Sequence, residues 1–199
     1  MNKQQKTSQI ASILSTKTIG IAGAGGLGSN VAIALARSGV KRFIIADYDV
    51  VEESNLNRQY YFLSQIGKVK VKALQENIKN INPDIKCTLH QEKLMKGSMS
   101  EPFNDVDVII EALDQAEIKT QFIEEILHHL VDIPIVAASG VAGYGHSDRI
   151  RTIQSNHLYM VYDEEAHSSD NDVLLAPKVC LMANWQANIV LEILLGDIK

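Results

Sequence analysis

The stretch "KTIGIAGAGGLGSNVAIALARSG", residues 17–39, decides the fold class of this chain of 199 residues. Residues 17–23 have the apolar pattern of a buried parallel strand. Residues 26–39 have the pattern of a helix, which Gly39 closes. The stretch "RFIIAD", residues 42–47, follows as a second strand. Together these pieces predict a βαβ unit in which a glycine-rich turn joins the first strand to the helix.

Strand and helix patterns continue to alternate beyond this unit. We expect helices over about 65–80 and 115–130, and strands near 85–90 and over 106–113 and 133–140. After Gly145 the sequence indicates two short antiparallel strands, "RIRTIQ" and "HLYMVY", then an exposed polar loop over 163–173 and a last helix that is apolar on most sides. The sequence therefore predicts one α/β domain over residues 1–199, with a doubly wound, mostly parallel Rossmann-like sheet, short antiparallel strands at its C-terminal side and a terminal apolar helix.

Charge, apolar runs and cysteine content argue against several classes of protein. The formal net charge of −5 disfavours nonspecific nucleic-acid binding. No uninterrupted apolar run approaches the roughly 18–20 residues of a membrane span, and the N-terminal residues lack the core of a signal peptide, so we expect no membrane contact and a cytoplasmic location. The two cysteines, Cys87 and Cys180, are far apart in sequence, and we expect neither a disulfide framework nor a zinc site.

The turn "GAGGLG" carries the G-x-G-x-x-G pattern between a strand and a helix. Such a turn lets backbone N–H groups approach a phosphate at the positive end of a helix. Asp47 follows the second strand, 19 residues beyond Gly28, where an acid can accept hydrogen bonds from a ribose. We expect Gly23, Gly25, Gly26, Gly28 and Asp47 to bind a nucleotide. The motif does not choose between ATP and NAD, and a purely structural glycine turn is the alternative to both.

The segment "SNLNRQ", residues 54–59, favours ATP over NAD. A triphosphate carries more charge than one glycine turn and one helix dipole offset, so an ATP site needs cations and usually Mg²⁺. Arg58 can direct two hydrogen bonds at phosphate oxygens, and Asn55 and Gln59 can orient the same group. Lys70 follows near the start of the next helix. We therefore expect a site for ATP and Mg²⁺.

These segments, together with "LMANWQANIVLEILLG" near the C-terminus, resemble the ThiF/MoeB/HesA family of adenylyltransferases, relatives of ubiquitin-activating enzymes. The similarity is greatest to the short ThiF-type proteins of thiamine biosynthesis. It implies adenylation, with MgATP, of the C-terminal glycine carboxylate of a small ubiquitin-like protein, and release of pyrophosphate. It also implies that Asp47 binds ribose, that Arg58 and Lys70 contact the triphosphate, and that Asn55 and Gln59 support the same site.

The family has an aspartate near Mg²⁺ and the α-phosphate, and Asp114 stands at that place here. The position of Asp114 after an apolar strand agrees with this role, because doubly wound sheets bind ligands at the carboxyl ends of their strands. Alternatively, Asp114 caps the helix that follows. The chain departs from the family at Gln115 and Lys119, where an asparagine and an arginine are usual. The N-terminal arginine of some relatives is also missing, and Lys3, Lys6 or Lys17 would replace it only loosely.

The partner implied by the resemblance is a ThiS-like, ubiquitin-fold sulfur carrier with a Gly-Gly C-terminus, in the thiazole branch of thiamine biosynthesis. The loop over 163–173 has no cysteine, so we expect the reaction to stop at the acyl-adenylate or to pass it to a separate sulfur donor. The segment "SGVAGYGH", residues 139–146, is either a floor for the Gly-Gly tail or a flexible turn. The last helix suggests a homodimer. Carriers for molybdopterin, cysteine or peptide modification, an NAD-dependent oxidoreductase and a non-catalytic scaffold are the alternatives.

Overall fold

The computed structural model describes residues 2–165, 172–196 and 198. Its sheet has seven strands in the order β3-β2-β1-β4-β5-β7-β6. All neighbouring pairs are parallel except β6 with β7, which are antiparallel, so the predicted mostly parallel sheet with antiparallel strands at its C-terminal side is confirmed. The strands are β1 (Thr18–Ala22), β2 (Arg42–Ala46), β3 (Lys86–His90), β4 (Val108–Glu111), β5 (Ile135–Ser139), β6 (Ile150–Ser155) and β7 (Leu158–Asp163).

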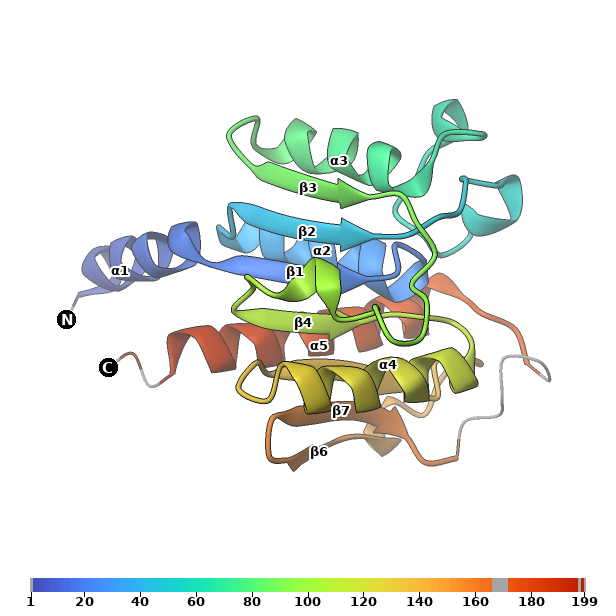
Figure 1. Cartoon of the computed structure of the whole chain (residues 1–199). Coiled ribbons are helices and arrows are strands. Elements are labelled where there is room, and N and C mark those ends of the chain that lie inside the picture. The colour runs from blue at the N-terminus through green and yellow to red at the C-terminus, as the bar shows by residue number, and fades with distance from the viewer. Residues whose placement is uncertain (1, 166–171, 197, 199) are drawn as a thin grey trace.

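Helices cover both faces of this sheet (Figure 1). Leu35 of α2 and Met182 of α5 belong to a large apolar core on one face, and Phe122 of α4 belongs to a second core on the other. Such two-sided cover defines the doubly wound architecture. The α-helices are α1 (Lys3–Thr16), α2 (Gly26–Ser38), α3 (Lys70–Ile81), α4 (Ala116–His129) and α5 (Ala176–Leu195), and short 3-10 turns lie at η1 (Glu53–Asn55), η2 (Leu63–Gln65), η3 (Glu101–Phe103) and η4 (Ser147–Arg149).

The helix predicted over about 65–80 begins later, at Lys70. Residues 67–70 pair instead with the backbone just after β2, through Gly67 N to the Val51 carbonyl (2.8 Å), Val51 N to the Lys68 carbonyl (2.8 Å) and Lys70 N to the Asp49 carbonyl (2.9 Å). Gly67 has φ +83°, a conformation in which glycine is preferred. This pairing places the first residue of α3 beside the end of β2.

The predicted exposed loop over 163–173 is wrong at its first residue. Asp163 ends β7 and is 7% exposed. Its carboxylate accepts a hydrogen bond from the buried ammonium of Lys178, in the first turn of α5 (2.8 Å). Residues 166–171 lie outside the described residues. The predicted terminal apolar helix is confirmed as α5, with Pro177 in its first turn.

Helix α5 is long and apolar enough, by length and composition alone, to cross a membrane. Core helices of globular domains pass the same test. Here 44% of the most apolar window is buried within the fold. Val179, Met182, Ala183 and Val190 are among its buried residues, so one side of α5 packs as a core helix does.

Candidate functional site

The glycine-rich turn joins β1 to α2 in a close-packed geometry. Gly23 has φ +94°, and a Cβ there would lie 2.5 Å from the Ala112 carbonyl oxygen at the end of β4. A Cβ at Gly28 would lie 1.9 Å from the Gly23 carbonyl oxygen. Beside Gly25, in contrast, the nearest atom to an added Cβ is 3.8 Å away, in the Gln59 side chain. The turn therefore needs Gly23 and Gly28 for its own packing, whereas Gly25 leaves space at the start of α2.

Asp47 connects this turn to the end of β2. One carboxylate oxygen accepts a hydrogen bond from Ala24 N at 2.6 Å, and the other accepts one from Asp49 N at 2.8 Å. Burial raises the pKa of Asp47, and these two backbone N–H groups oppose the rise. Each oxygen retains a second lone pair. The Asp47 carboxylate thus shapes the turn and keeps capacity to accept a ligand hydroxyl.

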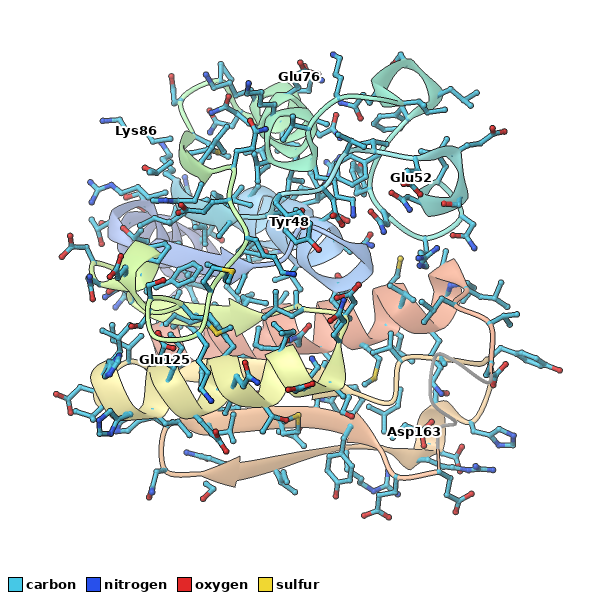
Figure 2. The ribbon with its side chains drawn as sticks, turned by 45° about the vertical axis from the view of Figure 1, so that its right-hand side comes forward. Tyr48, Glu52, Glu76, Lys86, Glu125 and Asp163 are labelled. Atoms are coloured by element: carbon cyan, nitrogen blue, oxygen red, sulfur yellow. The ribbon has the colours of Figure 1, made fainter. Side chains whose placement is uncertain are left out.

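A polar pocket of about 240 Å³ lies beside the turn. Five of the residues predicted for the site line it together, and they come from the β2–α3 segment and from the turn after β4: Asn55, Arg58, Gln59, Lys70 and Asp114. Asp49, Val50 and Glu52 complete the lining. Figure 2 shows Glu52 on the segment between β2 and α3. The carboxyl ends of β2 and β4 flank the pocket, as expected for a ligand site in a doubly wound sheet.

The two cations of the pocket are held differently. Lys70 is 6% exposed, and its ammonium contacts an Asp49 carboxylate oxygen at 2.8 Å. One guanidinium nitrogen of Arg58 donates to the Ser54 carbonyl (3.0 Å) and to the Asn57 side chain (2.7 Å). No ion pair among the described residues includes Arg58, so its remaining donors are available to an anion. The Arg58 Cγ lies 3.8 Å from the place that a Gly26 Cβ would occupy, which puts this side chain against the glycine turn.

The side-chain amides of the "SNLNRQ" segment make different contacts. The Asn55 side chain accepts a hydrogen bond from Glu52 N (3.1 Å) and so closes the turn that carries "SNLNRQ". Gln59 is buried, and its side-chain carbonyl oxygen has no hydrogen-bond partner among the described residues. The Asn57 side chain donates to the Leu174 carbonyl at 3.0 Å, which ties the same turn to the residues before α5.

Asp114 is exposed at the carboxyl end of β4. The N-cap of α4 is Gln115, which makes no side-chain capping bond, so the alternative that Asp114 caps this helix is wrong. Lys119 does not line the pocket. Its ammonium instead contacts the carboxylate of Glu111, which is 0% exposed, and donates to the Ala138 carbonyl (3.0 Å). Burial raises the pKa of Glu111, and the Lys119 ammonium and the Leu113 N–H counteract that rise.

Residue patterns did not reveal three acidic members of this region, namely Asp49, Glu52 and Glu111. A charged residue inside the apolar strand "VDVIIEAL" was the available signal for Glu111, and the second acid of "DYD" was the signal for Asp49. Lys17 lies at the other end of the sheet, where its ammonium contacts Asp107 at the start of β4 (2.8 Å). The described part of the chain contains no group of three or more His, Cys, Asp or Glu side chains that could hold a metal ion.

The fold and the pocket together define a Rossmann-like α/β domain whose glycine turn adjoins a cation-bearing pocket. Residues 6–199 match the ThiF family. The chain therefore belongs to the ThiF family, and the resemblance noted from the sequence is confirmed.

Two curated proteins are similar to part of this chain. A tRNA threonylcarbamoyladenosine dehydratase of Bacillus subtilis (strain 168) is 37% identical over 133 residues, which are 65% of this chain and 51% of that protein. A ubiquitin-like modifier-activating enzyme 5 of Caenorhabditis elegans is 32% identical over 114 residues, which are 51% of this chain and 27% of that protein. The chain thus spans about half or less of the length of these curated relatives.

A similar fold occurs in the crystal structure of E. coli tRNA N6-threonylcarbamoyladenosine dehydratase in complex with AMP. The TM-score is 0.83 at 20% identity, with 92% of this chain and 88% of that chain covered. The same protein in complex with ATP gives a TM-score of 0.82 over 95% of this chain and 88% of that chain. E. coli MccB with AMPCPP and MccA has a TM-score of 0.73 at 19% identity and covers 94% of this chain and 58% of that chain.

Proposed function

We propose that this protein uses ATP to adenylate the C-terminal glycine carboxylate of a small ubiquitin-like carrier protein and releases pyrophosphate. The observation that carries the proposal is the grouping of Arg58, Lys70 and Asp114 in one pocket beside the glycine turn. Cations with unused donors suit a triphosphate, and an exposed acid at the end of β4 suits its metal ion. The AMP and ATP complexes of the similarly folded E. coli dehydratase support an adenine nucleotide as the ligand.

The proposed reaction needs no general base. A carboxylate oxygen of the carrier attacks the α-phosphorus of ATP. The bond from that phosphorus to the bridging oxygen of the β-phosphate breaks, and pyrophosphate leaves with the electron pair. No proton changes place, so the protein contributes positioning and charge neutralisation. Arg58 and Lys70 would offset charge on the phosphates, while Asp47 would hold the ribose.

The donor set of the pocket fits Mg²⁺. Asp49, Glu52 and Asp114 present carboxylates beside Arg58 and Lys70, and a triphosphate would be repelled by these acids without a divalent cation. Mg²⁺ is commonly held by one or two carboxylates together with phosphate oxygens, which agrees with the small number of acids here. When bound, Mg²⁺ would neutralise charge on the phosphates. Among the described acids of the pocket, Asp49 pairs with Lys70, whereas Glu52 and Asp114 make no ion pair. We assign the metal to Asp114, because it follows β4 at the carboxyl end of the sheet.

For the carrier, we propose a ThiS-like protein with a Gly-Gly C-terminus, acting in thiazole synthesis. The basis is the similarity of the chain to the short ThiF-type proteins. Relatives named as ubiquitin-like modifier-activating enzymes, and a similar fold determined with MccA, support a small protein or peptide as the acceptor. Relatives named for tRNA threonylcarbamoyladenosine dehydration make that tRNA the acceptor to test beside it. We also propose a cytoplasmic homodimer.

Exchange of labelled pyrophosphate into ATP tests this function. We expect exchange with MgATP and a carrier that ends in Gly-Gly, and none with the same carrier after removal of its last two residues. Arg58→Ala should reduce the exchange rate about 100-fold or more, because a donor to the reacting phosphates is lost, while the fold remains. The matched control is Arg42→Ala, on an exposed strand end away from the pocket. Exchange that depends on tRNA and not on any carrier would overturn the choice of acceptor, and no exchange with either would overturn the adenylation itself.

A further inference from the structure

A buried ion pair lies under the turn that carries Asp114. Glu111, the last residue of β4, is 0% exposed, and the Lys119 side chain is 17% exposed. Their charged groups are in direct contact. Lys119 also donates to the Ala138 carbonyl near the end of β5 (3.0 Å). The pair therefore connects the ends of two neighbouring strands with α4.

The other oxygen of Glu111 acts on the turn itself. It accepts a hydrogen bond from Leu113 N at 2.7 Å, one residue before Asp114. On the opposite side, Ala112 N donates to the Ala22 carbonyl (2.9 Å), which holds the start of the same turn against β1 and the glycine turn. The Gln186 amide of α5 donates to the backbone carbonyls of Glu111 (3.2 Å) and Val136 (3.1 Å). The backbone of every residue from Glu111 to Leu113 thus makes a hydrogen bond, and Asp114 is the first residue beyond them.

Stability alone does not account for this pair. Removing two charges from water has a large free-energy cost, and well-packed apolar residues often replace a buried pair without loss of stability. A carboxylate that accepts hydrogen bonds from both an ammonium and a backbone N–H nevertheless fixes the orientation of those two groups relative to each other. An apolar residue does not do this. The arrangement therefore favours a role in orientation.

We propose that the Glu111–Lys119 pair positions Asp114 for the metal-bound phosphate. Neither residue touches the nucleotide in this proposal, so both are positioning residues. The inference rests on the proposed function, in which Asp114 acts beside Mg²⁺ and the α-phosphate. It assigns a task to Lys119, which stands where the family usually has arginine.

Three variants of the pair and one matched control test the proposal. Lys119→Met removes the ammonium and leaves Glu111 buried without its partner, so it also weakens the fold. Glu111→Leu combined with Lys119→Met removes both charges and the bond to Leu113 N, and an apolar pair of similar volume should keep the melting temperature near that of the wild type. Lys119→Arg retains the charge and the donors. The matched control is Lys17→Met, which breaks the Lys17–Asp107 pair at the other end of β4.

The main readouts are the kcat and KM of pyrophosphate exchange and the Mg²⁺ concentration that gives half of the maximal rate. In the double variant we expect kcat to fall about tenfold or more and the half-saturating Mg²⁺ concentration to rise, while the KM for ATP changes by less than about threefold. Lys119→Arg should restore most of the rate, and Lys17→Met should match the wild type. A folded double variant with unchanged kcat and unchanged Mg²⁺ dependence would overturn the proposal.

Amide hydrogen exchange gives a second readout that needs no activity. Leu113 N–H should exchange faster in Lys119→Met and in the double variant, but not in Lys17→Met, because its acceptor is displaced or lost. Unchanged protection of this amide in both variants would show that the pair does not order the turn. If the wild type shows no pyrophosphate exchange, the proposed function fails, and amide exchange alone then decides whether the pair orders the turn.

Discussion

At the scale of single residues, two glycines of the turn have different roles: Gly28 is needed for packing, whereas Gly25 leaves space for a ligand. Gly28→Ala would place a Cβ 1.9 Å from a backbone oxygen, which does not move without displacing β1 or α2. We expect a loss of at least about 2 kcal/mol in the free energy of unfolding, measured by urea denaturation, because overpacking of a tight contact forces backbone shifts.

Gly25→Ala is the matched control, because its Cβ would meet no atom closer than 3.8 Å. It should unfold at nearly the same urea concentration as the wild type. Since the added methyl group would lie 3.8 Å from the side chain of Gln59, which lines the pocket, nucleotide affinity should fall although stability does not. Equal destabilisation by both substitutions would contradict this separation of roles.

The residues that patterns predicted and those they missed differ in one physical respect. Lys70 and Asp114 lie where strands and helices end, and the end of a strand can be placed from the sequence when the apolar pattern is clear. Asp49 and Glu111 act through pairing with Lys70 and Lys119, and these contacts exist only after the sheet has formed. Patterns therefore predicted the cations and one acid of the pocket, but neither Asp49, which pairs with Lys70 inside the pocket, nor Glu111, which pairs with Lys119 outside it.

At the scale of elements, the predicted strands and helices followed the apolar periodicity, whereas the start of α3 did not. The start of α3 moved to Lys70 because residues 67–70 pair with the backbone after β2. That pairing joins segments about 20 residues apart, and local helix propensity contains no information about it. The shift places the Lys70 ammonium beside Asp49 and inside the pocket.

The pair between Asp163 and Lys178 joins β7 to α5, and it should make the fold sensitive to acid. Burial tends to raise the pKa of Asp163, but the Lys178 ammonium and the Glu165 N–H outweigh it, and the pKa falls below the usual 3.8. A lowered pKa in the folded state contributes stability above pH 3.8, and this contribution is lost as the pH falls through the folded-state value.

Asp163→Asn tests this link between the two elements. We expect it to lower the free energy of unfolding near neutral pH by about 3 kcal/mol, because Lys178 stays buried without its counter-charge. The variant should also lose less additional stability than the wild type between about pH 5 and pH 3. Urea denaturation across this range measures both effects. An identical acid-induced loss in the two proteins would show that another carboxylate is responsible.

At the scale of the whole molecule, ligand-induced stabilisation distinguishes ATP from NADH. MgATP at about 100 times its Kd should raise the melting temperature by roughly 5–10 °C, since binding to the native state alone contributes about 2.7 kcal/mol. NADH should give a much smaller shift. Arg58→Ala should reduce the MgATP shift and leave the melting temperature without ligand unchanged. A larger shift with NADH than with MgATP would favour the oxidoreductase alternative.

Among the described residues, those that line the pocket lie between residues 49 and 70 or at Asp114, all in the first 114 residues of the chain. The later elements, from β5 to α5, brace that region through Ala138, Leu174 and Gln186 without lining it. The residues that line the pocket and the elements that brace them thus lie in separate parts of the sequence. Substitutions from β5 onward should therefore affect the pocket through the hydrogen bonds at Ala138, Leu174 and Gln186, and not by changing a residue of its described lining.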